Sequence, residues 1–120
     1  MASLFLAGGS LADMVWTGRA TQSIHRSLEP EIALADLGRA WSPLNLENYV
    51  YRLARPGLDL QVILAKRDTA VMPELSDGLL LALKSAGGRP QTLSLNCGHY
   101  SLEKLPYIFY AGLSLKRFLA

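Results

Sequence analysis

Cysteine is almost missing from the sequence of 120 residues, which contains only Cys97. A single cysteine excludes a disulfide within the chain and any metal site built from several cysteines. Long apolar runs are missing too, since no stretch approaches the roughly 20 residues of a membrane helix. We therefore expect no membrane span. We also expect no cofactor, and no metal at His25, which has no acidic or cysteine partner at ligand spacing.

Charge is sparse as well. Charged residues make up 18% of the chain, the net charge is +2, and the basic residues are scattered. The nearest approach to a basic patch, without an aromatic ladder beside it, consists of Arg52, Arg55, Lys66 and Arg67. This distribution predicts no nucleic-acid partner. The opening residues MASLFLAGGSLAD lack the positively charged leader of a secretion signal and suit a strand and turn, so we expect a cytoplasmic location.

Three short segments have the composition of strands. The run Leu60–Ala65 is apolar except for Gln61, which is typical of a strand buried on both faces in a parallel sheet covered by helices. Gln91–Leu95 predicts a second strand. The apolar run Ala2–Ala7, which two glycines end, predicts another.

Helical spacing dominates the remaining sequence. The predicted helices span Leu11–Leu28, two segments within Glu31–Ala54, Pro73–Ala86 and Leu105–Ala120. Gly18 weakens the middle of the first of these helices. Ser10 and Asn45 are predicted N-caps, because their side-chain oxygens can accept from free backbone N–H groups at a helix start.

The order strand, helices, strand, helix, strand, helix predicts an α/β fold with a parallel sheet and right-handed crossovers. We expect three layers, in which a partial sheet of about three strands is flanked by helices. Residues 1–10 then form a strand and turn, residues 11–57 a helical cap inserted after that strand, and residues 58–120 the remainder with its two loops and last helix.

Two reactive side chains follow neighbouring strands of this sheet. Asp68 stands just beyond one strand, and His99 follows the next. Because parallel strands end at the same edge, where open α/β sheets place their chemistry, we expect the two residues to converge. In a catalytic triad a histidine takes the proton of the nucleophile while a buried carboxylate orients that histidine. Asp68 and His99 are therefore the candidate catalytic residues. The alternative for Asp68 is a helix cap, since an aspartate after a strand often has only this role and Asp68 can cap a helix from Thr69 onward.

In detail, the segment Val62–Pro73, in which Asp68 precedes Val-Met-Pro, resembles the acid loop of the α/β-hydrolase family. The segment Asn96–Tyr100, which reads NCGHY, resembles the histidine loop of that family. The resemblance covers most of the chain and implies the sixth, seventh and eighth strands of the family fold, with a helical cap after the sixth. It implies that His99 is the general base and Asp68 its orienting acid.

The nucleophile of this family stands earlier, on a Gly-x-Ser-x-Gly turn between a strand and a helix. The chain has no such motif, and the nearest sequence is Gly-Gly-Ser-Leu-Ala around Ser10. If Ser10 were the nucleophile, one more strand should separate its helix from the acid strand, but residues 31–54 offer only helices. We favour Ser10 as a turn and cap residue, and we expect the nucleophile upstream of Met1.

Functions from two classes follow. The resemblance implies the C-terminal portion of a serine hydrolase that acts on small carboxylic esters and is inactive as an isolated chain. The alternative is a non-catalytic half-domain that associates with itself, as a homodimer, or with a complementing N-terminal half, through the exposed edge of its first strand. A minimal esterase that uses Ser10 is a third interpretation.

Overall fold

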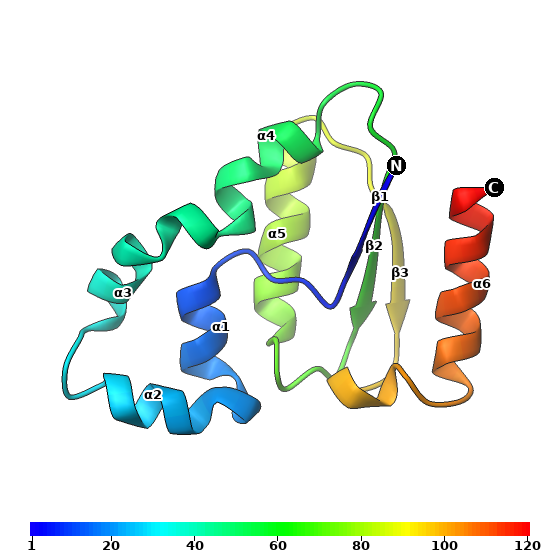
Figure 1. Cartoon of the computed structure of the whole chain (residues 1–120). Helices are drawn as coiled ribbons and strands as arrows, with labels where there is room; N and C mark the ends of the chain where they lie inside the picture. Colours follow the sequence, from blue (N-terminus) through cyan, green and yellow to red (C-terminus); the bar gives the residue numbers. More distant parts are fainter.

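A computed structural model describes all 120 residues of the chain. A three-stranded parallel sheet forms its centre, in the order β1 (Ala2–Phe5), β2 (Leu60–Ala65) and β3 (Gln91–Leu95). All three strands run in the same direction and end at the same edge (Figure 1). The structure confirms the predicted α/β class and makes β2 the central strand.

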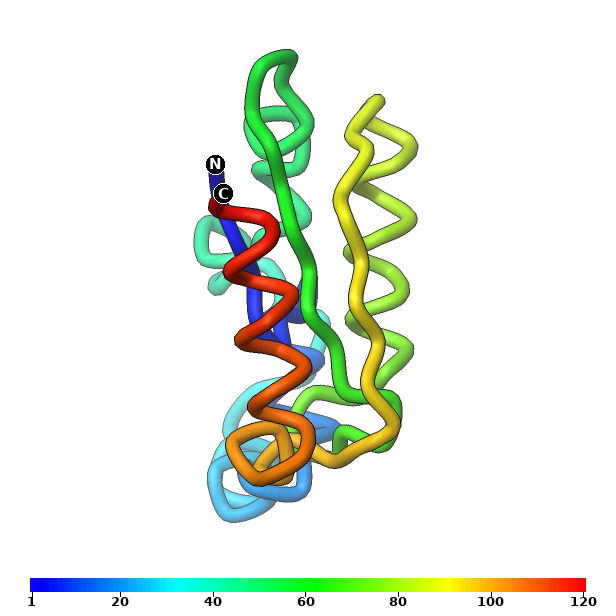
Figure 2. The backbone as a smooth tube through the Cα atoms, turned by 90° about the vertical axis from the view of Figure 1, so that its right-hand side faces the viewer, coloured from blue at the N-terminus to red at the C-terminus, as the bar shows by residue number.

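Helices cover both faces of this sheet. Helix α5 (Pro73–Ser85) lies against one face and α6 (Tyr107–Leu119) against the other (Figure 2). Successive side chains of β2 point to opposite faces. One set joins the core beside α5, which contains Leu60, Val62, Leu64, Leu79 and Leu83. The other joins the core beside α6, which contains Ile63, Ala65, Cys97, Leu102 and Ala111. As its apolar run predicts, β2 is therefore buried along its whole length.

Gln61 is the one polar residue of β2, and only 2% of its surface is exposed. Its side-chain oxygen accepts a hydrogen bond from the Ser3 hydroxyl at 3.1 Å. Its amide nitrogen donates to the Ser114 hydroxyl of α6 at 3.0 Å. A buried amide without partners is costly, so these two serines make a polar residue tolerable here. They also connect β1 and α6 to the central strand.

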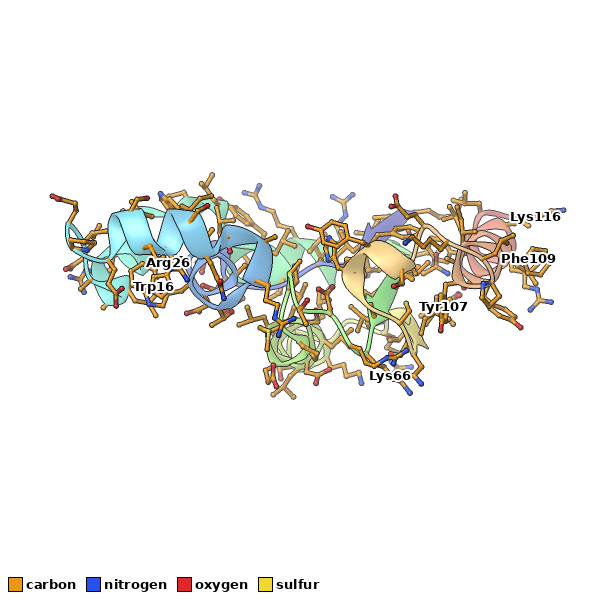
Figure 3. All side chains as sticks on the ribbon, turned by 90° about the horizontal axis from the view of Figure 1, so that it is seen from below. Trp16, Arg26, Lys66, Tyr107, Phe109 and Lys116 are labelled. Carbon is orange, nitrogen blue, oxygen red and sulfur yellow. The ribbon has the colours of Figure 1, made fainter.

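The chain between β1 and β2 is largely helical. It contains α1 (Leu11–Thr17), a 3-10 turn at Arg19–Thr21, α2 (Gln22–Leu28), α3 (Leu34–Ala40), 3-10 turns at Ser42–Leu44 and Leu46–Tyr49, and α4 (Val50–Leu53). Helices α1, α2 and α3 extend to the side of the molecule away from α6 (Figure 1). Seen along the strands, Trp16 and Arg26 lie at one end of the molecule and Lys116 at the other (Figure 3). None of the helices has the length and apolarity needed to cross a membrane.

The prediction of one continuous helix over Leu11–Leu28 is wrong, because the chain leaves the helix at Gly18. This glycine has extended backbone angles, φ −70° and ψ 138°. Its position is crowded, since an added Cβ would clash with the backbone oxygens of Ala70 and Met14. The next residue, Arg19, donates its backbone N–H to Thr69 O at 2.7 Å. The break therefore lets the segment after α1 bind the loop that follows β2.

The N-terminus of α1 is capped by two side chains. The Ser10 hydroxyl accepts from Asp13 N at 3.4 Å, which confirms its predicted role as a cap. Asn45 was predicted to cap the helical segment that follows it, and this is wrong, because its Oδ1 accepts from Leu11 N at 2.9 Å. Asn45 thus joins the connection after α3 to the start of α1, a contact between residues 34 positions apart in the chain.

Candidate acid–base site

Asp68 lies in the turn that follows β2, and 4% of its side chain is exposed. One carboxylate oxygen, Oδ1, accepts from the backbone N–H groups of Ala70 and Val71, each at 2.8 Å. These bonds hold the following loop in a turn that the side chain itself stabilises. The alternative prediction, that Asp68 caps a helix from Thr69 onward, is wrong, because the next helix begins only at Pro73 and the carboxylate stabilises a turn instead.

The second carboxylate oxygen of Asp68 serves a different partner. Oδ2 lies 2.8 Å from Nδ1 of His99, which opens the 3-10 turn His99–Ser101 after β3. The predicted convergence of the two side chains is confirmed, across 31 residues of sequence. Each oxygen thus has its own task, since Oδ1 shapes the acid loop and Oδ2 holds the histidine.

The network around His99 indicates which tautomer is present. An ionised carboxylate can only accept, so Nδ1 of His99 is the donor in this bond. In a neutral imidazole the other nitrogen, Nε2, then has a free lone pair. Nε2 makes no hydrogen bond within the chain, and 27% of the His99 side chain is exposed. The pair is arranged as a general base needs to be, with one nitrogen oriented by an acid and the other available to a proton donor.

An apolar groove of about 520 Å³ adjoins His99. Its lining comes from β1, from the histidine loop and from α6, and consists of Phe5, Leu6, His99, Tyr100, Leu102, Glu103, Ile108, Ala111, Gly112 and Leu115. Phe5 and Ile108 remain 43% and 48% exposed beside it. The base therefore borders an open apolar surface.

The groove touches the carboxyl end of β1 at Phe5, and this strand pairs with β2 on one side only. Ala2 and Leu6 donate backbone N–H groups to the chain around β2. Because alternate residues of a strand point their backbone groups in opposite directions, those of Ser3 and Phe5 point to the open side. Sheet order alone thus leaves a short strand edge unpaired next to the site.

Ser10 lies apart from this arrangement. Its hydroxyl is engaged at the start of α1, it makes no hydrogen bond with His99, and it does not line the groove. The residues that meet the Ser10 region are Asn45, which caps the same helix, and Glu47, which approaches Gly9. The structure therefore brings together the acid and the histidine of the predicted triad, but not Ser10.

The structure also places Cys97 and His25, the two other side chains whose reactivity or metal binding the sequence raised. Cys97 is 1% exposed, and burial raises the pKa of its thiol, an effect that Arg67 opposes and Asp68 reinforces. A raised pKa disfavours the reactive thiolate. The ring of His25 packs on Trp16, with centroids 4.0 Å apart, and its Nε2 lies 3.9 Å from a Glu29 oxygen. The prediction that His25 has no acidic neighbour is therefore wrong.

Comparison with protein-family models, with curated proteins and with solved structures finds no match for the chain. What defines the protein is therefore its own architecture, an α/β fold with a three-stranded parallel sheet. The site consists of an aspartate and a histidine at the carboxyl edge of that sheet.

Proposed function

We propose that Asp68 and His99 are the acid and base of a hydrolytic triad, and that polypeptide outside these 120 residues supplies the nucleophile. The observation that supports this proposal is the 2.8 Å bond between His99 Nδ1 and a buried carboxylate, in a histidine whose Nε2 has no hydrogen bond and which lines an apolar groove. The position after two adjacent parallel strands adds to it, as does the resemblance of both loops to those of α/β-hydrolases. The substrate class is small carboxylic esters.

In this reaction, Nε2 of His99 takes the proton of a serine hydroxyl while the serine oxygen attacks the ester carbonyl. Asp68 holds the imidazole in the required tautomer and stabilises the imidazolium that forms. His99 then gives its proton to the departing alcohol, and an acyl-enzyme remains. In the second half, Nε2 takes a proton from the water that attacks the acyl group. His99 then returns this proton to the serine oxygen as the bond between that oxygen and the acyl group breaks, which releases the carboxylic acid and restores the serine hydroxyl.

Ester hydrolysis by the protein isolated from its natural source, with any associated polypeptide, tests this proposal. The His99→Gln variant should lower kcat/KM for p-nitrophenyl acetate about 10⁶-fold, as the loss of the histidine of a triad does. The matched control is His25→Gln, which replaces the other histidine and should leave the rate unchanged. Equal rates in all three proteins, or no hydrolysis by the unaltered protein, would contradict the proposal.

A second function rests on a different observation, the open edge of β1. Unpaired strand edges are templates for association, and this one carries free backbone groups at Ser3 and Phe5 beside apolar side chains. The chain is then a half-domain that pairs with a second copy or with a complementing segment. Sedimentation velocity of the chain alone should show dimers whose fraction rises with concentration, and Phe5→Lys should abolish them. The matched control is Leu81→Lys, at an exposed leucine of α5, which should leave the dimers unchanged. A monomer at every concentration refutes self-association.

A further inference from the structure

The acid loop and the histidine loop are joined by hydrogen bonds outside the aspartate–histidine pair. Arg67, which directly precedes the aspartate, binds two successive carbonyls of the histidine loop. Its backbone N–H donates to Cys97 O at 2.9 Å, and its guanidinium Nη2 donates to Asn96 O at 2.7 Å. The Asn96 carbonyl also accepts from the Tyr107 hydroxyl, at the start of α6, at 3.2 Å. Three donors therefore hold the segment that leads from β3 to the histidine.

From these contacts we infer that Arg67 is a positioning residue for His99, and that Tyr107 assists it through the same carbonyl. Arg67 is suited to this task because one residue spans both loops, through its main chain and its side chain together. Gly98 lies against the same loop, since a Cβ built on it would be in ordinary van der Waals contact with Arg67 O, at 3.4 Å. The histidine loop therefore lies directly beside the acid loop, and the hydrogen bonds from Arg67 hold it there.

The connection from Arg67 to the imidazole is short. Asn96 is separated from His99 by two residues, and the 3-10 turn that begins at His99 is closed by Ser101 N donating to Gly98 O at 3.1 Å. A displacement of this segment therefore carries the ring with it. The bond from Nδ1 to Asp68 Oδ2 is 2.8 Å long, and hydrogen bonds weaken steeply once distance or angle departs from the optimum.

The consequence for catalysis rests on the proposed function, because a loosened His99 loses the tautomer and orientation that a general base needs. The placement of the His99 ring depends only on residues of this chain and requires no nucleophile. A spectroscopic measurement on the chain therefore tests the role of Arg67 separately from the esterase activity. If the protein hydrolyses no ester, Arg67 can still be shown to hold the His99 ring. If Arg67 does not hold the ring, the esterase proposal is still tested by the hydrolysis assay.

The test is imidazole ¹⁵N NMR of the chain, which reports the Nδ1–H and Nε2–H tautomers of His99. Arg67→Met removes the guanidinium and keeps an unbranched apolar side chain. It should lower the ratio of Asp68-bonded to unbonded His99 about fivefold, the factor that corresponds to one hydrogen bond of about 1 kcal/mol. Tyr107→Phe should shift the same ratio in the same direction by a smaller factor. Arg67→Lys, which keeps one charged donor, should restore part of it.

The matched control is Lys66→Met, which removes a neighbouring exposed cation whose side chain makes no hydrogen bond. It should leave the His99 signals unchanged. Far-UV circular dichroism shows whether each variant is folded. If Arg67→Met is unfolded, Tyr107→Phe replaces it as the test variant. The inference is overturned if folded Arg67→Met, or Tyr107→Phe in its place, keeps the His99 signals of the unaltered chain. It is equally overturned if Lys66→Met changes them as much.

Discussion

Replacing Asp68 separates the two tasks of its carboxylate. Asp68→Ala removes three acceptor contacts of 2.8 Å, two to backbone N–H groups and one to His99. A hydrogen bond to a charged group contributes about 1.5–3 kcal/mol when buried. The three donors are only partly buried, so water replaces part of each bond, and we expect a loss of about 3 kcal/mol in the free energy of unfolding.

Asp68→Asn should cost less, about 1 kcal/mol, because the amide oxygen can keep both backbone N–H groups. The amide nitrogen then faces Nδ1 of His99, and as a donor it forces the imidazole into the Nε2–H tautomer. Nε2 can no longer accept a proton from a nucleophile. The variant should therefore stay nearly as stable as the unaltered chain while its base is disabled.

Urea unfolding followed by circular dichroism measures the first effect, and imidazole ¹⁵N NMR measures the second. Asp77, an exposed aspartate on α5, is the matched control, and its Ala and Asn variants should change stability by less than about 0.5 kcal/mol. Equal losses for Asp68→Ala and Asp68→Asn would refute the division of tasks between the two oxygens. An unchanged His99 tautomer in Asp68→Asn would refute the assignment of Nδ1 as the donor.

Three further predictions concern the framework of the site. Gly18→Ala should cost about 1–3 kcal/mol, because its Cβ would clash with Ala70 O, whereas Gly112→Ala, with open space around it, should stabilise α6 by up to about 1 kcal/mol. Urea midpoints that move in the same direction would contradict this contrast. Gln61→Met should lower the unfolding free energy by about 1–3 kcal/mol in the same assay, because both serine partners lose their bonds; no loss would refute the structural role of the amide. Since burial raises the pKa of Cys97 in the folded chain, the folded state holds this proton more tightly than the unfolded state does, and the resulting stability is lost as pH rises above about 9. The free energy of unfolding should fall more steeply there for the unaltered chain than for Cys97→Ala, and parallel pH profiles would show that the thiol contributes nothing.

Local composition was enough to predict the features that position the site. The apolar run of β2 and the period of α5 each specify their element without reference to distant residues, and both formed close to the predicted bounds. Parallel strands end at one edge, so the convergence of Asp68 and His99 followed from topology alone. The catalytic role of the pair stays a prediction.

The features that sequence reasoning missed all depend on partners far away in the chain. Asn45 looks like a cap for the residues after it, but its partner stands 34 positions earlier. The helix break at Gly18 is set by Ala70 on another loop. Arg67 appeared only as part of a weak basic patch, because its partner Asn96 is 29 residues away. Backbone carbonyls give no signal in a sequence, so such contacts could not be predicted from residue types.

The most direct test of the proposed triad is labelling with a fluorophosphonate probe, which reacts with activated serines, followed by mass spectrometry of the modified peptide. We predict that the protein from its natural source is labelled at a serine outside these 120 residues and that His99→Gln abolishes this labelling. Ser10 should remain unmodified. Labelling of Ser10, or labelling that persists without His99, would contradict the account.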